Sequence, residues 1–118
     1  MVEIKETSRE FSKVETYLMT VAPNITTLNN VEAGTKIVVD GFMIFDDVKK
    51  DGEAVEVMSI ITPEKAVFSC QSATFKKSVK DIYNIMDGET FTIIKMDGET
   101  KAGRKYIDCV LDVDSIQK

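Results

Sequence analysis

The chain has 118 residues, of which 43% are hydrophobic and 30% charged, and its formal net charge is −5. A chain of this length can bury a core within one domain without disulfides or a bound metal. No apolar run approaches the roughly 18 residues of a membrane-spanning helix, and the charged first ten residues lack the apolar centre of a secretory signal peptide. We therefore expect a cytoplasmic protein that does not enter a membrane.

Residues 1–30 are predicted to form a helical extension to the main domain. Apolar residues recur there at the spacing of one helix face, at Phe11, Val14, Tyr17 and Leu18. Ser8 is a candidate N-cap, and Pro23 interrupts the pattern because proline cannot continue a helix. We expect this helix to pack on the body of the protein or on a partner, with partial disorder of the segment as the alternative.

Residues 31–118 are predicted to form the main domain, which begins with three strands. Residues 34–48 are rich in β-branched and aromatic side chains, as is typical of a long strand, and Gly41 in its middle indicates a bulge or a sharp bend. A polar turn follows, and residues 54–62 and 66–71 are predicted as the second and third strands.

The hydrophobic period changes to that of a helix between residues 72 and 86. The predicted buried face is formed by Phe75, Val79, Ile82, Tyr83 and Met86. Ser72 or Thr74 can cap its start, and Gly88 suits the position just beyond its end. Three cationic residues lie off this apolar stripe, namely Lys76, Lys77 and Lys80.

Two further strands, at residues 89–96 and 104–113, complete the order strand-strand-strand-helix-strand-strand. This is the order of the OB-fold, a small five-stranded Greek-key barrel. In that fold, the loops between strands 1 and 2 and between strands 4 and 5 flank the ligand face, and here they are residues 46–53 and 97–105. We therefore predict a mainly β protein with helices, with a different α+β arrangement as the alternative.

The composition argues against catalysis and against a metal site. The chain has no histidine, which is the commonest general base near neutral pH, and no CxxC pair for zinc. Cys70 and Cys109 each lie inside an apolar run, so we expect two buried thiols. The carboxylates of Asp46, Asp47 and Asp51 do not match a calcium loop and are interpreted as a solvated turn. We expect no enzyme activity, no catalytic residue and no cofactor.

Positive charge gathers in one part of this acidic chain. Residues 1–64 carry a net charge of −6, residues 65–105 carry +3, and residues 106–118 carry −2. The segment KMDGETKAGRKY at residues 95–106 places cations and two flexible glycines directly before Tyr106. Because Ile107 and the following alternate residues are expected to face the core, Tyr106 should point outward. An outward ring beside cations suits stacked bases and phosphates, and a half-buried tyrosine beside a solvated turn is the alternative.

Phe42 is a second candidate for base stacking. Phe42 and Phe45 lie on opposite faces of the first strand, so one of them should face away from the core, and Phe42 shares its face with Asp40. Burial of both rings beneath the helices is the alternative. The complete set of predicted nucleic-acid-binding residues is Lys95, Lys101, Arg104, Lys105, Tyr106, Phe42, Lys49 and Lys50.

Three segments within residues 29–113 resemble the small single-stranded-DNA-binding proteins encoded by tailed phages of Gram-positive bacteria. The first is a G-x-x-I-x-V-x-G strand beginning at Gly34, the second is the S-x-x-F helix start at Ser72, and the third is the K-x-G-R-x-Y approach beginning at Lys101. The resemblance implies an OB-fold that coats single strands during phage DNA replication or recombination in the host cytoplasm. The final segment DVDSIQK is only mildly acidic, so the tail-mediated partner recruitment of many such proteins is in doubt.

Two functions from different classes remain open. The first is sequence-tolerant, non-catalytic binding of single-stranded DNA, with replication or recombination proteins and further copies of the chain as candidate partners. The second is a protein-interaction or assembly module on the same fold, in which outward aromatics form the partner interface. The basic segment at residues 95–106 favours DNA, whereas the net charge of −5 argues mildly against DNA.

Overall fold

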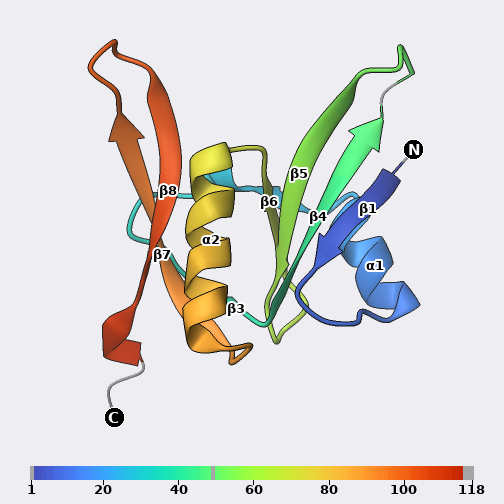
Figure 1. Cartoon of the computed structure of the whole chain (residues 1–118), viewed down its shortest axis with the longest axis horizontal. Helices are drawn as coiled ribbons and strands as arrows, with labels where there is room; N and C mark the ends of the chain where they lie inside the picture. Colours follow the sequence, from blue (N-terminus) through green and yellow to red (C-terminus); the bar gives the residue numbers. More distant parts are fainter. Residues whose placement is uncertain (1, 49, 116–118) are drawn as a thin grey trace.

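The computed structural model describes residues 2–48 and 50–115, which form a mainly β protein with two α-helices (Figure 1). The strands are β1 (Val2–Thr7), β2 (Thr26–Thr27), β3 (Lys36–Val39), β4 (Gly41–Val48), β5 (Ala54–Ile61), β6 (Val67–Cys70), β7 (Phe91–Glu99) and β8 (Lys105–Leu111). The helices are α1 (Lys13–Thr20) and α2 (Ala73–Met86), with short 3-10 turns at Leu28–Asn30 and Val113–Ser115. Neither α-helix of this described part is long and apolar enough to cross a membrane.

The strands form two sheets, a five-stranded one in the order β1-β4-β5-β6-β2 and a three-stranded one in the order β3-β7-β8. The predicted long first strand connects them: it is interrupted at Asp40, so that β3 belongs to one sheet and β4 to the other. The bend expected at Gly41 is confirmed. A side chain would not fit there, because a Cβ atom at this position would lie 2.9 Å from the Phe11 ring.

The first thirty residues are more than a helical extension. Val2–Thr7 form β1, which pairs antiparallel with β4, and β2 pairs parallel with β6. Both edges of the five-stranded sheet therefore come from this segment. The helix α1 begins later than predicted. Its N-cap is Ser12, which exchanges hydrogen bonds with Glu15 in a capping box, whereas the Ser8 hydroxyl accepts from the Phe42 backbone N–H at 2.9 Å.

Both faces of β4 are buried, because α2 and the three-stranded sheet cover one face and α1 covers the other (Figure 1). Phe42 points into the main core beside Phe75 of α2, and only 2% of its surface is exposed. Phe45 packs in a second cluster with Met19 of α1. The prediction of an outward Phe42 is therefore wrong: its ring lies edge-on to Tyr83, with 5.2 Å between the ring centroids, and cannot stack a base.

The helix α2 follows its predicted pattern closely, with Ser72 as N-cap and Phe75 and Val79 fully buried. It ends at Met86, its C-cap Asp87 is in the left-handed conformation, and Gly88 lies just beyond the end as expected, with a φ of +83°. Lys76 differs from the prediction because it is buried. Its Nζ donates to the carbonyl and to the carboxylate of Glu56 of β5, both at 3.0 Å. The hydrogen bond from Lys5, and to a smaller extent the one from Lys76, lowers the pKa of Glu56 to about 2. Through these three side chains the cluster links β1, β5 and α2.

Candidate nucleic-acid interface

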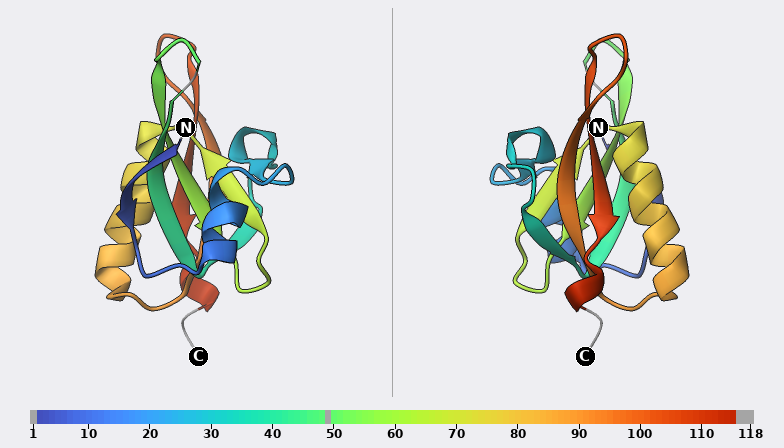
Figure 2. Two further views of the ribbon diagram at one scale, coloured as in Figure 1. Left: turned by 90° about the vertical axis from the view of Figure 1, so that its right-hand side faces the viewer. Right: turned by 90° about the vertical axis from the view of Figure 1, so that its left-hand side faces the viewer.

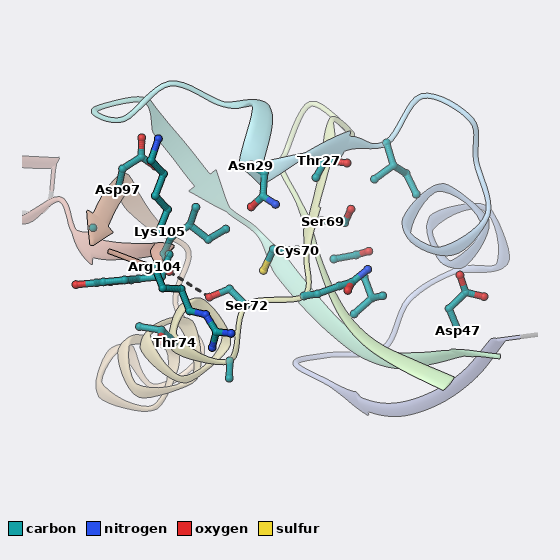
Figure 3. Close-up of a pocket in the computed structure, with 18 of the residues that line it drawn as sticks. Thr27, Asn29, Asp47, Ser69, Cys70, Ser72, Thr74, Asp97, Arg104 and Lys105 are labelled. Carbon is teal, nitrogen blue, oxygen red and sulfur yellow. Dashed lines mark hydrogen bonds between the residues drawn. The ribbon is translucent and has the colours of Figure 1, made fainter. Parts of the chain in front are cut away.

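A groove of about 1310 Å³ lies between the β4–β5 hairpin and the β7–β8 hairpin (Figure 3). The two hairpins diverge from the body of the protein, as Figure 1 shows. Residues 97–99 and 104–107 of the β7–β8 hairpin line one side of the groove. Residues 69–74, at the end of β6 and the start of α2, line its base, and β4, β5 and residues 20–29 complete the other side.

The groove exists because β6 and β8 do not pair within the described residues. The edge of β6 that could receive β8 is instead paired with β2, through Thr26 with Phe68 and Thr27 with Ser69. One hydrogen bond connects the start of α2 to β8: the Ser72 hydroxyl donates to the Ile107 carbonyl at 3.1 Å (Figure 3). The N-terminal segment thus shapes this site as well as the sheet.

Three predicted cations lie exposed at the tip of the β7–β8 hairpin, namely Lys101, Arg104 and Lys105. The tip is an ordered turn. The Thr100 N–H donates to the Arg104 carbonyl at 2.9 Å, the Gly103 N–H donates to the Thr100 carbonyl at 2.9 Å, and Gly103 has a φ of +84° that favours glycine. Arg104 and Lys105 line the groove, and the Arg104 side chain extends toward Thr74 at the start of α2 (Figure 3).

Lys50 is exposed in the turn of the opposite hairpin, between β4 and β5. Lys49, the other cation predicted there, lies outside the described residues. The fold places Lys50 and the three cations of the β7–β8 tip on hairpins that flank one groove, and the tip that carries Lys50 also carries the exposed carboxylates of Asp51 and Glu53.

The exposed cations at the tips differ from the others in their ion pairing. Eight of the described Lys and Arg residues pair with carboxylates, and they are Lys5, Arg9, Lys36, Lys65, Lys76, Lys77, Lys80 and Lys95. Within the described part of the chain, the cations without such a pair are Lys13, Lys50, Lys101, Arg104 and Lys105. Four of these five lie at the two hairpin tips, where positive charge remains available to a ligand.

Tyr106 is 40% exposed and lies over Gly98, its cross-strand partner. A Cβ atom at Gly98 would lie 2.3 Å from Cζ of the tyrosine, so only glycine leaves room for the ring in this position. The expected alternation is confirmed, because Ile107 and Cys109 are buried while Tyr106 and Val110 are exposed. The hairpin therefore supports the ring from below and leaves part of it open to a ligand.

The prediction that Lys95 contacts nucleic acid is wrong. Strand alternation places it on the same face as the buried Ile93, and only 1% of its surface is exposed. Its Nζ donates to the Val31 carbonyl at 2.7 Å and forms an ion pair with Asp97. Lys95 thus anchors the base of the hairpin to the N-terminal segment and has no access to a ligand.

The sequence did not reveal the uncharged polar side chains that line the groove. They are Thr20, Thr27, Asn29, Ser59, Ser69, Gln71, Ser72 and Thr74. Hydroxyl and amide groups of this kind bond sugars, phosphates and base edges. They come from separate segments that only the sheet topology brings together, so no local pattern could have identified them. Three carboxylates also line the groove, at Asp47, Asp97 and Glu99. Asp97 is paired with Lys95, and the other two will repel phosphates from the interior of the groove.

Cys70 lines the groove but is 4% exposed, and burial raises the pKa of its thiol to about 11. The pKa of the Cys109 thiol is raised to about 12, mainly by burial and to a smaller extent by the negative charge of Asp108. Both cysteines are therefore poor nucleophiles near neutral pH. In residues 2–48 and 50–115, no group of cysteine and acidic side chains is arranged to hold a metal ion.

Comparison with known proteins does not place the chain in a family. No protein-family model matches it, and no curated protein or solved structure with significant similarity to it was found. What the groove can bind follows from its own residues.

Proposed function

We propose that the protein binds single-stranded DNA between its two hairpins, with little sequence preference and without catalysis. The observation that carries this proposal is the position of the cations that have no ion pair. Lys50 lies at one hairpin tip, and Lys101, Arg104 and Lys105 lie at the other. Cations on both sides of a groove can follow the phosphates of a strand that crosses it.

The stacking partner in this proposal is Tyr106. Its ring is held over Gly98 and is partly exposed beside Arg104 and Lys105. Every base has a π-face, so stacking on one ring tolerates any sequence. The carboxylates inside the groove favour a path in which phosphates stay near the cationic tips and bases approach the hydroxyl and amide groups.

The order of elements supports an OB-fold. In this assignment β3 and β4 together form the bent first strand, β5 and β6 are the second and third, α2 is the linking helix, and β7 and β8 are the fourth and fifth. The two hairpin tips then correspond to the loops that flank the ligand face. The resemblance of the sequence to phage single-stranded-DNA-binding proteins supports a role in phage DNA replication or recombination.

The test is a fluorescence anisotropy titration of a labelled oligo-dT strand, a mixed-sequence strand and the matching duplex, each over a salt series. We expect similar affinity for the two single strands and weaker binding of the duplex. Four phosphate contacts predict that log K falls with log salt concentration with a slope of about −3, at roughly 0.7 per contact.

Arg104→Ala should weaken binding of all single strands alike and reduce the size of that slope by about 0.7. Lys77→Ala is the matched control, because Lys77 is an exposed cation already paired with Asp81 on α2. It should leave both affinity and slope unchanged. Equal affinity for strand and duplex, or no binding of either at low salt, would instead favour the protein-interaction module, for which the exposed Met96 and Val110 offer an apolar surface.

A further inference from the structure

The helix α1 has apolar side chains on two opposite faces. Its inner face buries Met19 completely against β5 and β6. Its outer face carries Val14, Tyr17 and the C-cap residue Val21, which are 67%, 51% and 62% exposed. The spacing i, i+3, i+7 places these three on one stripe of the helix. A solvated helix face normally carries polar residues, so this stripe indicates a contact that one chain alone does not make.

Within the described residues, no other element covers this stripe, as the exposure of its three side chains shows. In the left view of Figure 2, α1 faces outward from the five-stranded sheet. The two threonines on the helix are already satisfied, since Thr16 donates to the Ser12 carbonyl and Thr20 donates to the Thr16 carbonyl. Their hydroxyls therefore need no partner outside the helix, and the Tyr17 hydroxyl is the polar side-chain group on the stripe.

The charges at the ends of α1 favour one kind of partner. The first turn carries Glu15, but its carboxylate already pairs with Arg9 and Lys65. Lys13 begins the helix and has no ion pair within the described residues, and a cation at this end is opposed by the helix dipole. The last turn, where a cation is favourable, carries no Lys or Arg. An antiparallel copy of the same helix would bring each Lys13 to the C-terminal end of the other, so the two ends are complementary.

We propose that α1 pairs with the α1 of a second copy of this chain, antiparallel about a two-fold axis close to Tyr17. The stripe is almost symmetric about that residue, so Val14 of one copy would face Val21 of the other and the two Tyr17 rings would meet at the axis. Such an interface is isologous and closes as a dimer.

Three side chains per copy form a much smaller surface than the roughly 800 Å² per partner of a standard interface. The dimer of the free protein should therefore be weak and depend on concentration. Thr20 lines the groove and is the last residue of α1, so pairing would bring two grooves close together. If the proposed function holds, two copies bound to one strand would then pair at a raised effective concentration. The pairing itself does not rest on that function.

Sedimentation equilibrium of the free chain over a wide concentration range tests the pairing without DNA. The average mass should rise from the monomer value of 13.2 kDa toward twice that value. Tyr17→Lys should abolish this rise, because it places two like charges at the axis. Ile85→Lys is the matched control on α2, where a 78% exposed apolar residue lies far from the stripe, and it should leave the rise intact.

Disulfide cross-linking tests the orientation, since both native thiols are buried. Tyr17→Cys should form a covalent dimer on oxidation. Val14→Cys mixed with Val21→Cys should form a heterodimer more readily than either variant alone forms a homodimer. A chain that stays monomeric at the highest concentration, a dimer insensitive to Tyr17→Lys, or equal cross-linking of Val14→Cys with itself would each overturn the proposal. Thermal melting of each variant confirms that it is folded.

Discussion

Replacing Gly98 by alanine tests whether the tyrosine ring above it binds DNA. A Cβ atom at Gly98 would lie 2.3 Å from Cζ and 2.5 Å from the hydroxyl oxygen of Tyr106. Carbon atoms in contact are about 3.5–4.0 Å apart, so the ring must move outward by more than about 1 Å. The backbone at Gly98 does not have positive φ, so alanine itself is tolerated there.

The stability of the fold should change little. Moving the half-exposed ring to another rotamer costs on the order of 1 kcal/mol, and removing a glycine from a strand recovers about 0.4–1 kcal/mol. Binding should suffer more, because the displaced ring no longer lies where a base can stack. The upper limit is the loss expected for Tyr106→Ala, about 1–3 kcal/mol, which corresponds to roughly 5- to 150-fold in affinity.

The assay is the oligo-dT titration over a salt series, combined with thermal melting. Gly98→Ala should bind more weakly at an unchanged salt slope, because no cation is lost. In a Tyr106→Ala background, Gly98→Ala should cause no further loss, since no ring remains to displace. Gly34→Ala is the control away from the groove lining and the hairpin tips, and it should leave binding unchanged. Its φ of +92° strains alanine, but a Cβ atom there meets nothing within 4 Å. Undiminished binding by Gly98→Ala would refute the stacking role of Tyr106.

Three further predictions concern the fold. Val79→Asp should destabilise the protein by several kcal/mol in denaturant unfolding, since Val79 is fully buried, and unchanged stability would show that α2 is misplaced. The Glu56 pKa of about 2 lies below its usual 4.5, so the stability from this carboxylate is present above pH 4.5 and is lost as pH falls toward 2. In Glu56→Gln, the free energy of unfolding should fall less between pH 4.5 and pH 2 than in the parent protein. A larger fall in the variant would contradict this prediction. Cys70 and Cys109 should react with a thiol reagent at pH 8 only after unfolding, because burial raises both pKa values, and rapid labelling of the native protein would disprove this.

The elements with a strong local pattern could be predicted from the sequence. The helix α2 has a cap at Ser72 and an uninterrupted apolar face, so its bounds follow from periodicity alone. The strand at residues 34–48 and its bend at Gly41 were also predictable, because few residues other than glycine suit such a position. The alternation of β8 correctly placed Tyr106 outward.

The features that the sequence did not predict depend on contacts between residues that are far apart in the chain. The strand β1 is defined by its pairing with β4, more than thirty residues away, and β2 is only two residues long. Phe42 was expected to face solvent because a sheet usually has one open face, but α1 and α2 close both faces of β4. The burial of Lys95 depends on a carbonyl of residue 31, which no spacing rule connects to it. The groove likewise depends on β2 occupying the edge of β6.

The proposed DNA binding has to be reconciled with the acidity of the protein, and the distribution of ion pairs bears on this. A net charge of −5 would repel DNA if all charges were equally accessible. Most cations of the described chain are instead neutralised within the fold, as in the pairs of Arg9 with Asp40 and of Lys65 with Glu15. Within the described residues, the cations without an ion pair lie at the two hairpin tips and at Lys13. Because screening reduces interactions beyond about 10 Å at ordinary salt, a strand at the tips interacts mainly with these nearby cations. In the proposed function, the local pattern of unpaired charge therefore matters more than the total charge for where a phosphate backbone would bind.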